Sequence, residues 1–130
     1  MNKHKETILT WMEFEIVVRA LAEKIKDSGI FFRNIHGIKR GGVVIAVRLS
    51  HLLDKPLVEF NEIEEHGKRT LLVDDISDSG NTFSRIKQIN YPFCPTASLY
   101  YKESSKLKPD FYVVERKADS DWITFPWERK

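Results

Sequence analysis

Apolar positions near the start of the chain recur at the three- and four-residue spacing of a helix. Thr10 followed by Glu13 is typical of a capping box, in which two side chains satisfy backbone amides at a helix start. Gly29 is typical of the residue that ends a helix. The pattern predicts an amphipathic helix between Thr10 and Gly29, whose apolar face consists of Phe14, Val17, Val18, Leu21 and Ile25.

The rest of the chain alternates between short β-rich stretches and helical patterns. We expect strands within 30–37, 56–60, 69–73, 96–101 and 111–114, and helices over 43–53 and 81–89. The apolar run 71–73 indicates a strand that is buried on both faces, as in a parallel sheet. This order predicts an α/β fold with a central, mostly parallel sheet flanked by helices, and ligands bound beyond the carboxyl ends of its strands.

Composition narrows the class of protein. The length of 130 residues, of which 42% are hydrophobic, suits one domain over 1–130. The 21 basic and 19 acidic residues nearly cancel, which argues against a nucleic-acid-binding protein. Cys94 is the single cysteine, and we find neither a signal-peptide pattern nor an apolar run near the roughly 20 residues of a membrane span. We therefore expect a cytoplasmic protein that binds neither nucleic acids nor membranes.

Two neighbouring acids follow the apolar run 71–73. Asp74 and Asp75 repel each other unless hydroxyl donors or a cation compensate their charges, and a ribose diol with a hydrated magnesium ion would do so. Asp78 then precedes a predicted helix start, where unpaired amides and partial positive charge suit a phosphate. The amides and hydroxyls available there belong to Ser79, Gly80, Asn81 and Thr82. A helix cap with solvated acids is the alternative explanation.

A basic, glycine-rich turn follows the first predicted strand of the alternating region. Lys39 and Arg40 stand beside Gly41 and Gly42, so that two cations and accessible backbone amides would suit a diphosphate group. Taken alone, four such residues more commonly form a solvated basic turn. The hypothesis of a diphosphate site is supported by the presence of the acidic turn in the same chain.

These turns resemble the motifs of type I phosphoribosyltransferases. In that family, a hydrophobic strand leads into two acids and an Asp/Thr/Ser-Gly-x-Thr loop, as it does here from Leu71 to Thr82. The basic turn is similar to the Ser-Arg-Gly-Gly loop of the xanthine-guanine branch. Tyr100 to Lys102 and Trp122 to Glu128 resemble that branch's Tyr-x-Lys and Trp-Ile-x-x-Pro-Trp-Asp segments. The resemblance follows the family order and covers 11–128.

The resemblance implies roles for the residues of both turns. Asp74 and Asp75 would hold the ribose hydroxyls and, through water, the magnesium ion, while 78–82 would cradle the 5-phosphate. Asp78 would also face N7 of the base and act as the general base. Lys39, Arg40 and the two glycines would bind the diphosphate. The family often has a cis peptide before the matching arginine, so we expect a cis bond between Lys39 and Arg40.

The carboxyl-terminal segments would form a small base-binding hood over about 100–130. The resemblance implies that Lys102 donates to the 6-oxo group of the purine, that Trp122 stacks on the ring, and that Ile123 offers backbone contacts. Glu128 replaces the family's aspartate, which leaves no metal-related role assigned to it. Packing in a hydrophobic core is the alternative explanation of the tryptophans.

The implied protein is a magnesium-dependent purine-salvage enzyme and, as is common in the family, a homodimer. It would transfer ribose 5-phosphate from 5-phosphoribosyl 1-diphosphate to guanine, xanthine or hypoxanthine. Adenine or a pyrimidine fits less well, because an ammonium such as that of Lys102 cannot accept a hydrogen bond from an amino group.

One departure from the family keeps a second function open. The family's long mobile hairpin is reduced here to 61–68, so the lid over the reacting centre is short or absent. Glu64, Glu65 and Lys68 would form either a small flap or a solvated turn. A short lid favours a non-catalytic regulator that senses a nucleotide or the diphosphosugar, and it also leaves open weak catalysis or a lid borrowed from another subunit.

Overall fold

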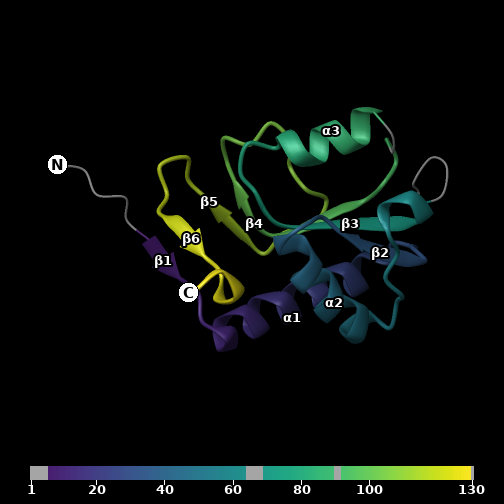
Figure 1. Cartoon of the computed structure of the whole chain (residues 1–130), viewed down its shortest axis with the longest axis horizontal. Helices are drawn as coiled ribbons and strands as arrows, with labels where there is room; N and C mark the ends of the chain where they lie inside the picture. The colour runs from purple at the N-terminus through teal and green to yellow at the C-terminus, as the bar shows by residue number, and fades with distance from the viewer. Residues whose placement is uncertain (1–5, 64–68, 90–91, 130) are drawn as a thin grey trace.

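A four-stranded parallel sheet lies at the centre of the protein. The computed structural model describes residues 6–63, 69–89 and 92–129. The sheet has the order β2-β3-β4-β5, and its strands are β2 (Asn34–Gly37), β3 (Thr70–Ser77), β4 (Thr96–Lys102) and β5 (Val114–Arg116). Helices α1 (Trp11–Ser28) and α2 (Gly41–Leu53) cover one face, and α3 (Asn81–Ile89) covers the other (Figure 1). The predicted α/β fold with a parallel sheet flanked by helices is therefore confirmed.

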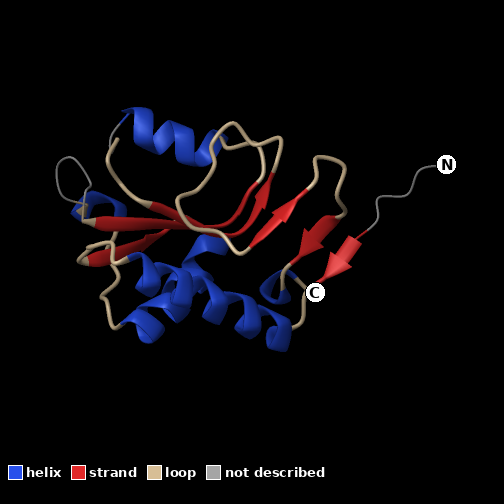
Figure 2. Cartoon of the chain, turned by 180° about the vertical axis from the view of Figure 1, so that it is seen from behind, coloured by secondary structure: helices blue, strands red, loops and turns tan. Residues whose placement is uncertain are grey.

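A second, smaller sheet extends the structure past β5. It pairs β1 (Glu6–Ile8) in parallel with β6 (Trp122–Thr124), and a short 3-10 helix, η2 (Pro126–Glu128), follows β6. Figure 2 shows this unit, which we call the hood, beside the β5 edge of the central sheet. The family resemblance implies the carboxyl-terminal part of the hood, over about 100–130, but not its β1 strand, which comes from the other end of the chain.

Local signals explain where α1 begins and ends. The Thr10 hydroxyl accepts a hydrogen bond from the Glu13 amide at 3.1 Å, and the Thr10 amide donates to the Glu13 carboxylate at 3.0 Å. The helix ends at Gly29, which has a φ of 69° that suits glycine. The predicted capping box and stop are thus confirmed. None of the helices in the described ranges is long and apolar enough to cross a membrane.

Strand β3 is buried on both faces, as its apolar run predicts. Leu71 and Val73 belong to the hydrophobic cluster under α1 and α2, whereas Leu72 belongs to a smaller cluster with Phe83 of α3. The strand is longer than the predicted 69–73, because Asp74, Ile76 and Ser77 continue to pair with β4. The two acids therefore lie within the last part of the strand, and the turn begins only at Asp78.

Three other predicted strands differ from the structure. The strand within 30–37 is confined to β2, and the one near 111–114 contributes a bridge at Phe111 before β5 begins. The prediction of a strand over 56–60 was wrong, since only Leu57 forms a bridge, to Ile35. Pro56 has no amide to donate, and the Glu59 amide donates a hydrogen bond to the Glu62 carboxylate at 2.8 Å in the 3-10 helix η1 (Phe60–Glu62) that follows.

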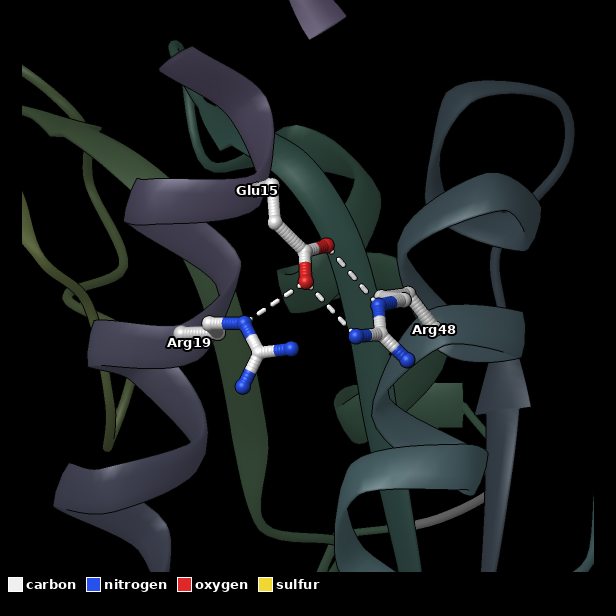
Figure 3. A network of polar contacts seen from close by, with 3 residues as sticks. All are labelled: Glu15, Arg19 and Arg48. Atoms are coloured by element: carbon white, nitrogen blue, oxygen red, sulfur yellow. Dashed lines mark hydrogen bonds and ion pairs between the residues drawn. The ribbon is translucent and has the colours of Figure 1, made fainter. Parts of the chain in front are cut away.

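An ion-pair network ties α1 to α2 (Figure 3). Arg48 of α2 donates two hydrogen bonds to the carboxylate of Glu15, at 2.8 and 2.6 Å, and Arg19 donates a third at 2.7 Å. The hydrogen bonds from Arg48 are the main reason that the pKa of Glu15 falls to about 2. Two-point contact between a guanidinium and a carboxylate is the strongest form of such a pair.

Replacement of Glu15 by glutamine tests this contact. We expect Glu15→Gln to lower the melting temperature at pH 7 by about 3 °C, because the side chains are partly exposed and the pair contributes modestly. The difference from the wild type should shrink as the pH falls from about 4.5 towards 2, where Glu15 becomes protonated in both folded and unfolded states.

Thermal unfolding followed by circular dichroism provides the measurement. Glu23→Gln is the matched control, since Glu23 lies on the same helix in a loose pair with Lys26 at 3.8 Å. Equal melting temperatures for the two variants at pH 7 would contradict a stabilising role of the Glu15 network.

Candidate active site

Two carboxylates occupy successive positions near the carboxyl end of β3. The Asp74 carboxylate accepts a hydrogen bond from the Asp75 amide at 2.9 Å, and the Asp75 carboxylate accepts one from the Ile76 amide at 2.8 Å. Both residues are partly buried. Each side chain is thus oriented by the backbone amide of the next residue.

Burial makes the two negative charges unfavourable. The pKa of Asp74 rises to about 8, first because the carboxyl is buried and then because the Asp75 charge lies next to it. Burial also raises the pKa of Asp75, and the charge of Glu128 adds to this effect. Donors from a diol or the charge of a divalent cation would therefore stabilise the ionised pair.

The turn after β3 forms a small concave site. Gly80 has a φ of 83°, and an added side chain there would approach the Ser105 hydroxyl within 2.6 Å, so glycine is required. The Ser79 hydroxyl accepts a hydrogen bond from the Asn81 amide at 3.2 Å at the start of α3. A cavity of about 70 Å³ lies here, lined among others by Asp74, Asp78, Ser79, Gly80 and Thr82. Asn81 does not line it.

A larger cavity of about 350 Å³ opens between the end of the sheet and the hood. Asp75 and Asp78 contribute to it from the end of β3, and Lys102 and Arg116 from the ends of β4 and β5. Trp122 and Ile123 of β6 line its hood side. The volume is in the range of small-molecule sites. Ile76 and Asp78 line both cavities, which are therefore neighbours.

Within the larger cavity, two predicted site residues contact each other. The Lys102 ammonium lies 3.2 Å from a carboxylate oxygen of Asp78. Trp122 is 65% exposed even though it lines the cavity, whereas Ile123 is buried. An exposed tryptophan at the edge of a cavity offers a flat surface on which a ring can stack.

The basic turn packs against the same end of β3. The peptide between Lys39 and Arg40 is cis, which confirms the expectation from the sequence. The Ile38 amide donates to the Val73 carbonyl at 2.8 Å, and the Gly41 backbone lies so close to the Asp75 side chain that no larger residue fits there. Gly42 packs equally closely on the backbone of β3. Lys39 and Arg40 are exposed, and neither lines the two cavities described above.

Sequence reasoning missed several residues that line the larger cavity. Arg116 and Asp121 are charged residues of its lining, and Phe125 is an apolar one. Glu128 lines it too, and its carboxylate accepts a hydrogen bond from the Phe125 amide at 2.9 Å. No local motif marks Arg116, since it enters the site only through the pairing of β5 with β4.

The acid pair suits a magnesium ion that keeps most of its water. Among the described residues, no three His, Cys, Asp or Glu side chains are grouped so that they alone could hold a metal ion. Magnesium is commonly bound by one or two carboxylates together with substrate phosphates and water. Asp74 and Asp75, whose ionised forms need compensation, fit that kind of binding.

Comparison with known proteins identifies the family. The model of the phosphoribosyl transferase domain matches residues 59–130. The chain belongs to the phosphoribosyltransferases. Within them it is xanthine-guanine-like: it is 30% identical to the xanthine-guanine phosphoribosyltransferase of Desulfotalea psychrophila, over 98% of this chain and 89% of that protein.

Two solved phosphoribosyltransferases share the fold. The purine phosphoribosyltransferase of Pyrococcus horikoshii is 32% identical, with a TM-score of 0.79 over 96% of this chain and 95% of that one. The xanthine-guanine-hypoxanthine phosphoribosyltransferase of Helicobacter pylori is 25% identical, with a TM-score of 0.79 over 97% and 94%. Both likenesses extend over nearly the whole of each chain, hood included.

The raised pKa of Asp74 predicts a pH-dependent cost to folding. An aspartate ordinarily ionises near 3.8, so the folded state loses stability as the pH rises from about 4 to about 8, where the buried carboxyl must ionise. Asp74→Asn keeps an oxygen for the Asp75 amide and removes this cost. We expect the variant to melt about 5 °C above the wild type at pH 8.5 in the absence of ligands.

Melting curves between pH 5 and pH 8.5 check this expectation, and the difference should be smallest at pH 5. Asp119→Asn, at an exposed position, serves as the control. A variant that is less stable than the wild type at pH 8.5 would contradict the account of the buried acid pair.

Proposed function

We propose that the protein transfers ribose 5-phosphate from 5-phosphoribosyl 1-diphosphate to an oxopurine, with magnesium as cofactor and diphosphate as the leaving group. The observation that carries this proposal is the pair of neighbouring cavities at the end of β3. The smaller one, beside Ser79 and Gly80, suits a phosphate, and the larger one, beside Lys102 and Trp122, suits a flat base. Asp74 and Asp75 lie where the sugar would connect the two.

Charge and position would supply most of the rate enhancement. In the reaction, the bond from C1′ to the diphosphate oxygen breaks and a bond from C1′ to the purine N9 forms, while the base loses a proton. Asp74 and Asp75 would hold the ribose hydroxyls and the hydration shell of magnesium, which supplies positive charge for the diphosphate. The basic turn, including Arg40, would bind the diphosphate, and Asp78 would accept the proton of the base.

Three residues would recognise the base. Lys102 is a donor without an acceptor, so it suits the 6-oxo group of guanine, xanthine or hypoxanthine and not the 6-amino group of adenine. Trp122 would stack on the ring, and the backbone of Ile123 would contact its edge. In the free protein Lys102 pairs with Asp78, so the incoming base would compete with that carboxylate for the ammonium.

We also propose a cytoplasmic homodimer whose partners are small molecules. Exposed apolar side chains on the neighbouring helices α1 and α2 support self-association, because exposed apolar residues are common at protein interfaces. They are Met12 and Ile16 on α1 and Val43 and Val47 on α2. The formal charge of +2 supports small-molecule substrates over nucleic acid. Light scattering at micromolar concentration would measure the subunit number, and a monomer would contradict the dimer.

Diphosphate release is the test of the proposed reaction. Wild-type protein with magnesium, 5-phosphoribosyl 1-diphosphate and one of guanine, xanthine, hypoxanthine or adenine should release diphosphate with the oxopurines and much less with adenine. Omission of magnesium should abolish release. The alternative is a non-catalytic sensor, which would bind the diphosphosugar without releasing diphosphate. The basis of this alternative is the short 61–68 interval, most of which lies outside the described residues. Binding of the diphosphosugar without release of diphosphate would contradict the proposed reaction and favour the sensor.

Asp78→Asn tests the proton acceptor. An amide cannot take up the proton, so we expect kcat to fall by about a hundredfold or more, while KM for the diphosphosugar changes by less than about threefold. Steady-state kinetics with each oxopurine provides the measurement, and Asp119→Asn, at an exposed position, is the matched control. A kcat near that of the wild type would exclude Asp78 from this role.

A further inference from the structure

Arg116 is a cation of the larger cavity to which the proposed reaction assigns no role. It is the last residue of β5, and its Cα is the direct partner of Lys102 in the β4–β5 register. The Glu103 amide donates to the Arg116 carbonyl at 2.8 Å, which holds the two strand ends together. The two basic residues therefore lie side by side, and both line the same cavity.

The two cations differ in their surroundings. Lys102 is paired with Asp78 at 3.2 Å. Arg116 is partly buried, yet none of the carboxylates in the described ranges forms an ion pair or hydrogen bond with its side chain. A guanidinium carries several donors in a fixed plane and no acceptor. A partly buried group of this kind that faces a cavity is suited to bind acceptor atoms of a ligand there.

The order of the strands indicates which part of a purine Arg116 would meet. The acid pair lies on β3, Lys102 on β4 and Arg116 on β5, and neighbouring strands are about 4.8 Å apart. A base whose N9 faces the sugar near Asp75 extends across β4 towards β5. Lys102 is then nearer to the 6-oxo group, and Arg116 lies one strand farther out, near the edge of the six-membered ring that carries position 2.

We propose that Arg116 selects the substituent at position 2 of the purine and so favours xanthine over guanine. The inference rests on the proposed reaction and adds a specificity residue to it. Xanthine has an acceptor, the 2-oxo group, where hypoxanthine has only hydrogen and guanine has an amino group. A guanidinium can donate a hydrogen bond to the 2-oxo group of xanthine but cannot accept one from the 2-amino group of guanine.

Asp121 offers the opposite chemistry in the same cavity. Its carboxylate could accept a hydrogen bond from a 2-amino group, which would favour guanine. It already accepts a hydrogen bond from the Thr7 hydroxyl of β1, at 3.4 Å. The Arg116 side chain has no such partner among the described residues, so we assign the contact with position 2 to Arg116. If Asp121 recognised a 2-amino group instead, the kinetic comparison below would show a change confined to guanine.

The test compares kcat/KM for xanthine, guanine and hypoxanthine in the wild type and in Arg116→Met. Methionine keeps the length of the apolar stem and removes the donors. We expect kcat/KM for xanthine to fall by about 10- to 100-fold, with changes below about threefold for the other two bases. Lys117→Met, at the exposed neighbouring position, is the control and should leave all three values unchanged.

A second variant keeps the proposal testable if Arg116→Met does not fold, as judged by circular dichroism. Arg116→Lys keeps the charge but loses the planar pair of donors, and should lose about fivefold on xanthine alone. Equal changes for all three bases, or a loss confined to guanine, would overturn the role of Arg116 while leaving the reaction intact. Absence of diphosphate release by the wild type with every base would instead refute the proposed reaction itself.

Discussion

The burial of two successive carboxylates at the end of β3 is the constraint around which the site is organised. Apolar clusters on both faces of the strand hold Asp74 and Asp75 in a position where their charges are unfavourable. The turn at Ser79 and Gly80 lies on one side of the two acids and the basic turn at Gly41 on the other, while the charge of Glu128 raises the pKa of Asp75 further. The two carboxyl groups are therefore most stable when at least one of them is protonated. Both ionise only when hydrogen-bond donors or a cation stabilise their negative charges.

The parallel sheet arranges the remaining parts of the site in a row. Because all four strands run in the same direction, their carboxyl ends meet at one edge, and each strand contributes one kind of group there. Strand β3 provides the acids, β4 provides Lys102 and β5 provides Arg116. Trp122 and Ile123 of the hood line the opposite side of the same cavity. The proposed sugar phosphate and base would therefore be held in fixed relative positions by groups gathered at one edge of the sheet.

Features that depend on neighbouring residues could be predicted from the sequence, and those that depend on distant pairing could not. The capping box at Thr10, the bounds of α3 and the turn at Gly80 follow from local chemistry and were predicted. The extension of β3 to Ser77 depends on pairing with β4, and strand β1 forms only because β6 is available to it. Arg116 was missed for the same reason, since nothing near it in the sequence links it to Lys102.

Proton release on ligand binding tests the central claim most directly. Burial raises the pKa of Asp74 to about 8, so at pH 7 this carboxyl would release a proton when it ionises to hold the proposed diol and magnesium ion. Calorimetric titration of the protein with magnesium and 5-phosphoribosyl 1-diphosphate, in two buffers of different ionisation enthalpy, measures the protons exchanged. We expect net proton release at pH 7 that disappears in Asp74→Asn and above about pH 9. Tight binding by the wild type with no more proton release than Asp74→Asn shows would contradict it.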